Sequence, residues 1–151
     1  MARHTYHRFL GGVALAAAAF SAVGTSATAS AVYPGVPEWF SQAKEHFDNT
    51  RNYMQAVIDA IAANDIGALR SACSLAHDEL SVNLQAHLPT PDPALTTALQ
   101  SEIDDAHTAM HICMSLGPNS TSADLERADS FMQQANLHMK TVDAILATDL
   151  S

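Results

Sequence analysis

Four side chains with metal-binding chemistry recur at helical spacing between residues 107 and 114, where the sequence reads HTAMHICM. His107, Met110, His111 and Met114 are separated by three or four residues, so a helix places them on one side. Imidazole binds copper, zinc and haem iron, and a thioether adds a preference for Cu(I). The stretch suggests a soft-metal or haem site, and the alternative interpretation is the packed seam of an ordinary helical bundle.

The positions of these side chains around a helix separate them further. At about 100° per residue, Met110 lies on the apolar stripe and is expected to pack in the core, whereas Met114 and His107 lie at its boundary. His111 is expected to face water, and His77 comes level with the stretch from an antiparallel neighbouring helix. The candidate ligands for copper or haem are therefore His77, His107, Met110, His111 and Met114. Histidine and methionine also occur in the other expected helices, which favours the packing interpretation, in which no cofactor is bound.

The patterns that mark common enzymes are incomplete or missing. Asp104 and His107 match half of a bundle di-iron motif, which needs a second Glu-x-x-His pair and further inward glutamates. The carboxylate doublets Asp78–Glu79 and Asp104–Asp105 diverge by about 100° on a helix, so both are expected on the solvated surface. The sequence lacks a nucleophile elbow and a phosphate-binding glycine loop. We therefore expect a protein that is not an enzyme.

Four amphipathic segments are expected to position these side chains. Apolar residues recur at helical intervals over about residues 38–63, 66–88, 94–116 and from about 122 to the C-terminal end. Asn64-Asp65, the sequence PTPDP at 89–93 and Gly117-Pro118 separate them, and residues 32–37 read as an extended lead-in. No alternating strand pattern appears. The sequence predicts an all-α fold, an up-down-up-down four-helix bundle over residues 38–151.

The first 31 residues have the layout of a secretory signal peptide. Arg3 and Arg8 precede an apolar run at 10–23, and small residues follow with A-x-A patterns ending at Ala29 and Ala31. The apolar run is shorter than the roughly 20 residues that a membrane-spanning helix needs. We expect cleavage after Ala31, followed by secretion or residence in the cell envelope without a stable membrane anchor.

The expected mature chain, residues 32–151, is strongly acidic. It holds all 16 acidic side chains and five basic ones, which gives a net charge of −11. Such a surface repels phosphate groups, so nucleic acid and anionic membranes are poor partners. The partner we expect is a protein or a small ligand of unknown identity.

Two cysteines, Cys73 and Cys113, lie in the second and third expected helices. In an oxidising compartment an even number of cysteines indicates a disulfide, and buried free thiols are the alternative. Both cysteines lie on apolar stripes, and counting about 1.5 Å per residue from the intervening turn leaves them roughly 6 Å apart in height. Helix tilt can absorb this difference, so we expect one disulfide between helices 2 and 3.

Three features resemble small exported, disulfide-containing helical proteins of mycobacteria and related actinobacteria. They are AANDIGALRSAC at 62–73, LPTPDPALTTALQ at 88–100, and Cys113. The resemblance implies a disulfide-stapled helical fold and export. Because no activity is assigned to these proteins, it transfers no functional residues. We expect an exported acidic bundle that acts by binding, with a copper or haem carrier as the alternative.

Overall fold

The structure is a computed structural model that describes residues 32–151, so the expected signal peptide at 1–31 lies outside the described residues. Every regular element of the described part is helical, and the prediction of an all-α four-helix bundle is confirmed. The elements are α1 (Val36–Ala62), α2 (Ile66–Asp78), the π-helix η1 (Glu79–Leu84), the 3₁₀-helix η2 (Gln85–His87), α3 (Pro93–Ser115) and α4 (Ser122–Asp149).

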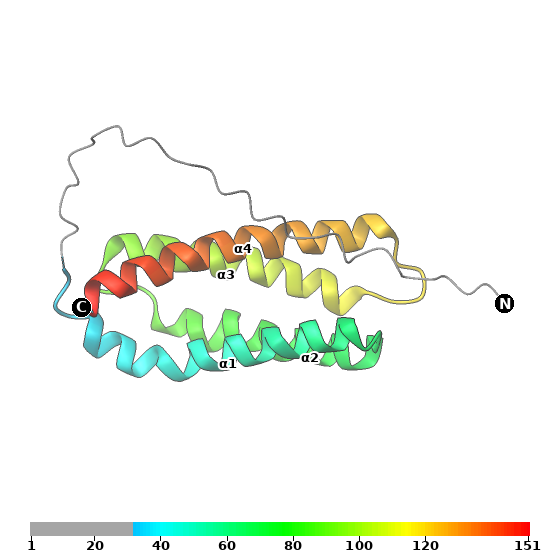
Figure 1. The fold of residues 1–151 in the computed structure, drawn as a ribbon, viewed down its shortest axis with the longest axis horizontal. Coiled ribbons are helices and arrows are strands. Elements are labelled where there is room, and N and C mark those ends of the chain that lie inside the picture. Colours follow the sequence, from blue (N-terminus) through cyan, green and yellow to red (C-terminus); the bar gives the residue numbers. More distant parts are fainter. Residues whose placement is uncertain (1–31) are drawn as a thin grey trace, which may run out of the picture.

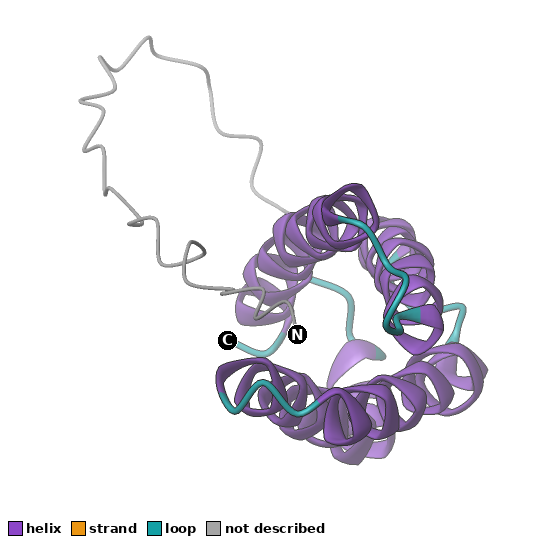
Figure 2. Cartoon of the chain, turned by 90° about the vertical axis from the view of Figure 1, so that its right-hand side faces the viewer, coloured by secondary structure: helices purple, strands orange, loops and turns teal. Residues whose placement is uncertain are grey.

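The helices form two layers along the long axis of the molecule. α1 packs with α2, and α3 packs with α4 (Figure 1). α1 and α3 begin at the end where the C-terminus lies, whereas α2 and α4 begin at the opposite end (Figure 1). Viewed end-on, the helices surround a common axis (Figure 2). None of the helices between residues 32 and 151 is both long and apolar enough to cross a membrane.

Polar caps set the starts of three helices. The side chains of Asp65, Asp92 and Thr121 each accept a hydrogen bond from a backbone N–H in the first turn of α2, α3 and α4. α1 begins at Val36, two residues earlier than expected. Its Pro37 stands in the first turn, where the missing N–H would have no helical partner and the ring fits the helical backbone.

The second expected helix is not one regular α-helix. It is α-helical only to Asp78, and the chain then continues as η1 and η2 before Pro89. Leu80 and Leu84, both fully buried, keep the same four-residue separation in either type of helix. The apolar pattern therefore could not distinguish the π-helix from the expected α-helix over these six residues.

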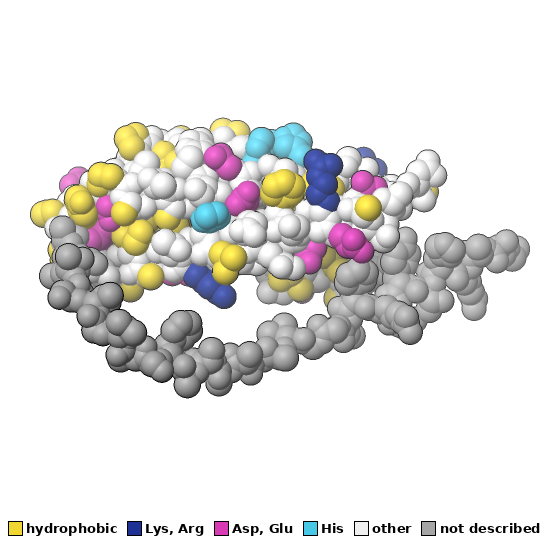
Figure 3. Space-filling view, turned by 90° about the horizontal axis from the view of Figure 1, so that it is seen from above, with side chains coloured by type: hydrophobic (Ala, Val, Ile, Leu, Met, Phe, Trp, Pro, Cys, Tyr) yellow, Lys and Arg dark blue, Asp and Glu magenta, His cyan; other side chains and the backbone are white. Residues whose placement is uncertain are grey.

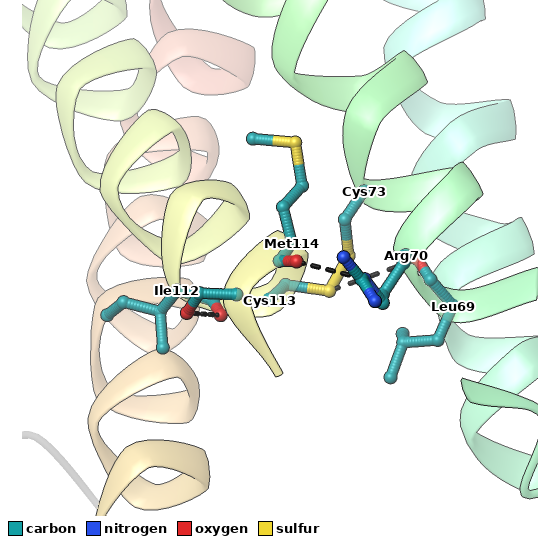
Figure 4. Close-up of a disulfide and its surroundings, with 7 residues drawn as sticks. Leu69, Arg70, Cys73, Ile112, Cys113 and Met114 are labelled. Atoms are coloured by element: carbon teal, nitrogen blue, oxygen red, sulfur yellow. Dashed lines mark hydrogen bonds between the residues drawn. A yellow bond between two sulfur atoms is a disulfide. The ribbon is translucent and has the colours of Figure 1, made fainter. Parts of the chain in front are cut away.

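The hydrophobic core lies between the two layers, and one covalent bridge joins them. The largest fully buried side chains of this core include Phe47, Leu99 and Met110. Cys73 of α2 and Cys113 of α3 form the expected disulfide, with their Cα atoms 6.2 Å apart (Figure 4). The bridge therefore holds together the two helices that carry the candidate metal ligands.

Candidate metal centre

Three histidines from α2 and α3 meet at the surface beside the disulfide. His77 stands in the last turn of α2, and His107 and His111 lie one turn apart on α3. The Nε2 atom of His111 is 3.2 Å from Nε2 of His77 and 3.0 Å from Nε2 of His107. One nitrogen from each ring lies within 4.8 Å of the other two. Figure 3 shows histidine side chains gathered at one edge of the molecular surface.

Two of the three separations between these nitrogens, those that involve His111, are close to those in a metal centre, and the nitrogens of His77 and His107 lie within 4.8 Å of each other. Metal–nitrogen bonds of about 2.0–2.1 Å in tetrahedral geometry place two ligand nitrogens about 3.3–3.4 Å apart. The separations of 3.2 Å and 3.0 Å need only a small outward movement of the rings to match. The ring centroids are 4.5–4.6 Å apart, which is too close for a porphyrin plane to lie between any two of the rings, so the arrangement favours a single metal ion over a haem bound between two histidines.

Hydrogen bonding among the three rings cannot satisfy all of these nitrogens. A neutral imidazole has one N–H and one acceptor nitrogen. Nδ1 of His77 lies 3.0 Å from a carboxylate oxygen of Asp78, so Nδ1 donates and Nε2 of His77 carries the lone pair. Nε2 of His111 has a single proton at most, which it can share with His77 or with His107 but not fully with both. A bound cation would instead accept all three lone pairs.

The surroundings of His107 favour its neutral form. Partial burial lowers the pKa of His107, and the nearby His77 and His111 lower it further, against a smaller opposing effect of Asp104. The neutral imidazole is the form that binds metal ions. The carboxylate of Asp78 has the position that carboxylates take behind metal-bound histidines, where they orient the ring and raise its basicity.

The two methionines among the candidate ligands lie in different surroundings. Met110 is 1% exposed and belongs to the hydrophobic core, as expected for a packing residue. Met114 is half-buried at the edge of the core, three residues after His111 on the same side of α3. The structure therefore brings His77, His107 and His111 together. Met114 lies one turn after His111 on the same side of α3, whereas Met110 is a packing residue of the core.

The other described histidines make separate contacts. Nδ1 of His46 is 2.6 Å from a carboxylate oxygen of Glu79, and its ring lies 5.0 Å from the ring of His87. Nε2 of His138 is 3.3 Å from a carboxylate oxygen of Asp105, across α3 and α4. None of these three histidines belongs to a group of three or more metal-ligating side chains in the described residues.

The expectation that both carboxylate doublets lie on the solvated surface is wrong for one member. Glu79 is only 5% exposed, and it accepts a hydrogen bond from Asn83 in addition to its contact with His46. Its neighbour Asp78 is exposed and supports His77. Adjacent positions on a helix point in different directions, so one carboxylate enters the α1 interface while the other stays at the rim.

The comparisons with protein families, with curated proteins and with solved structures found no match for this chain. No activity of a relative can therefore be transferred to it, and the case for a function rests on the side chains themselves. The group that has the side chains and spacing of a metal-ligand set is His77, His107 and His111, with Asp78 in contact with His77.

Proposed function

We propose that this protein is an exported, acidic helical bundle that binds one transition-metal ion through His77, His107 and His111. It acts by binding, not by catalysis. The observation that carries the proposal is the convergence of three imidazoles from two helices, with Nε2 of His111 3.2 Å from Nε2 of His77 and 3.0 Å from Nε2 of His107. Export is proposed from the signal-peptide pattern, and the disulfide supports it because such bridges persist in oxidising compartments.

The ligand set selects the class of ion. Imidazole nitrogens suit copper and zinc, whereas calcium and magnesium prefer oxygen ligands. Three histidines leave one coordination position of a tetrahedral ion open. His111 is exposed, so an ion has a direct path to and from the centre. These features support reversible binding, as in a carrier or buffer, in preference to a permanently enclosed structural ion.

Titration of the mature chain, residues 32–151, with Zn(II) at pH 7.5 tests this proposal. We expect one ion per chain, and we expect the double variant His107→Ala with His111→Ala to lose saturable binding. The matched control is His87→Ala with His138→Ala, which removes the same number of imidazoles from outside the centre. Circular dichroism would establish that both variants keep the helical fold. Undiminished binding by the first variant would contradict the proposal.

A further inference from the structure

We propose that Met114 supplies the fourth ligand of this centre and thereby makes it selective for Cu(I). The inference rests on the proposed function, because it adds one ligand to the three histidines. Met114 would occupy the coordination position that the three histidines leave open. The preferred ion is thereby narrowed from copper or zinc to monovalent copper.

The helix places Met114 on the same stripe as the two histidines of α3. His107, His111 and Met114 stand at positions i, i+4 and i+7, which on an α-helix fall within a sector of about 60°. Side chains on a helix tilt toward its N-terminus, so Met114 is directed toward the turn that carries His111. Figure 4 shows the Met114 side chain extending back along α3, toward the N-terminal end of that helix, in the space between α3 and α2.

The backbone at Met114 is held against the helix that contributes the third histidine. The guanidinium of Arg70, on α2, donates a hydrogen bond from Nε to the carbonyl oxygen of Met114 at 3.1 Å. The preceding residue, Cys113, is bonded to Cys73 of α2 (Figure 4). His77 lies one turn beyond Cys73. Met114 therefore lies at the same α2–α3 contact as the three histidines. Its side chain has enough rotatable bonds for the thioether to turn toward an ion.

The chemistry of the thioether gives the selectivity. Thioether sulfur is a soft, uncharged ligand that favours Cu(I), whereas Zn(II) in proteins is bound by nitrogen, thiolate and carboxylate oxygen. If Met114 binds the ion, its loss must weaken Cu(I) binding and leave Zn(II) binding unchanged. Loss of a residue that merely orients a ligand costs about 10–100-fold in metal affinity, so loss of a direct ligand is expected to cost at least about tenfold.

The test compares Met114→Leu with Met110→Leu, which removes a core thioether from the same helix at nearly constant volume. Cu(I) affinity would be measured anaerobically against a chromophoric Cu(I) chelator, with ascorbate as the reductant so that the disulfide stays intact. Zn(II) affinity would be measured on the same samples. We expect Met114→Leu to weaken Cu(I) binding at least about tenfold and Zn(II) binding not at all, with Met110→Leu unchanged for both ions.

X-ray absorption on the Cu(I)-loaded protein gives a second readout, namely a sulfur atom bound directly to copper that is absent in Met114→Leu. Equal Cu(I) affinity of Met114→Leu and the parent, with both still dependent on His107 and His111, would overturn the role of Met114 and leave the histidine centre intact. Failure of the parent to bind either Zn(II) or Cu(I) would overturn the proposed function and this inference together.

Discussion

The carboxylate of Asp78 lies 3.0 Å from Nδ1 of His77, the residue that precedes it in the chain. This contact leaves the Nε2 lone pair of His77 directed at the other two histidines. We expect Asp78→Ala to weaken Zn(II) binding by about tenfold, the lower end of the effect of such carboxylates, because the Asp78 side chain is 68% exposed.

The control for this prediction is Asp104→Ala, which removes the same charge from the neighbouring surface of α3. Asp104 accepts a hydrogen bond from Gln100 and makes none to a histidine ring of the centre. Isothermal titration calorimetry would measure the Zn(II) affinity of both variants. The comparison would separate the effect of Asp78 on the orientation of the His77 ring from the effect of its negative charge. Equal losses of affinity in the two variants would mean that Asp78 acts only through its charge.

The lowered pKa of His107 predicts how the centre responds to acid. Burial and the neighbouring imidazoles favour the neutral ring, so His107 stays unprotonated at pH values where an ordinary histidine, with a pKa near 6.5, is already charged. Protons still compete with the metal, so Zn(II) affinity should fall on acidification. An NMR titration of the histidine side chains measures this directly. A pKa of His107 at or above the ordinary value in the metal-free protein would contradict the prediction.

The buried carboxyl of Glu102 makes the stability of the fold depend on pH. Glu102 is 4% exposed, its Oε2 has no hydrogen-bond partner, and burial together with the charge of Asp105 raises its pKa to about 8. Between the unfolded value of 4.5 and about 8, the folded state keeps a proton that the unfolded state releases. The contribution of this group to stability is therefore full below pH 4.5 and falls as the pH rises to about 8, by up to about 1.4 kcal/mol per pH unit.

Glu102→Gln tests this assignment because it keeps the shape of the side chain and removes the titration. We expect the variant to gain stability relative to the parent as the pH is raised from 5 to 8, measured by urea unfolding. Glu126→Gln, at an exposed position of α4, serves as the control. A pH dependence in Glu102→Gln as steep as that of the parent would exclude Glu102 as its source.

The disulfide is expected to affect both stability and metal binding. Cys73 lies one turn from His77 and Cys113 lies two residues from His111, so the bridge fixes the spacing of the ligands across α2 and α3. Replacing both cysteines by alanine should cost about 4 kcal/mol in the free energy of unfolding, from the entropy of a 40-residue loop. It should also weaken Zn(II) binding. Unchanged metal affinity in a folded variant would show that the bridge does not position the centre.

Much of the fold could be predicted from local sequence signals. Apolar periodicity gave the four helices, Asp65 and Thr121 were recognisable as caps, and the positions of Cys73 and Cys113 on apolar stripes indicated their pairing. The π-helix η1 could not be predicted, because its leucines have the spacing of an α-helix. The prolines before residue 38 predict a helix start at about Glu38, but α1 begins at Val36 because Pro37 is compatible with a first helical turn.

The candidate site was only partly accessible from the sequence. Angular positions on a helix placed His107 at the boundary and His111 in water, and both placements agree with the structure. These angular positions give the direction in which a side chain leaves the helix, but not the position of the imidazole ring at its end. The convergence of three Nε2 atoms depends on the reach of each side chain across α2 and α3. The support of His77 by Asp78 depends on a local rotamer, which residue spacing does not determine.

The most direct test of the metal centre is anomalous diffraction from crystals of the Zn(II)-loaded protein, recorded on both sides of the zinc absorption edge. A single strong peak is expected about 2.0–2.1 Å from Nε2 of His77, His107 and His111. No peak between these three rings, or a dominant peak beside the His46–Glu79 pair instead, would contradict the proposal that they form the metal-binding centre.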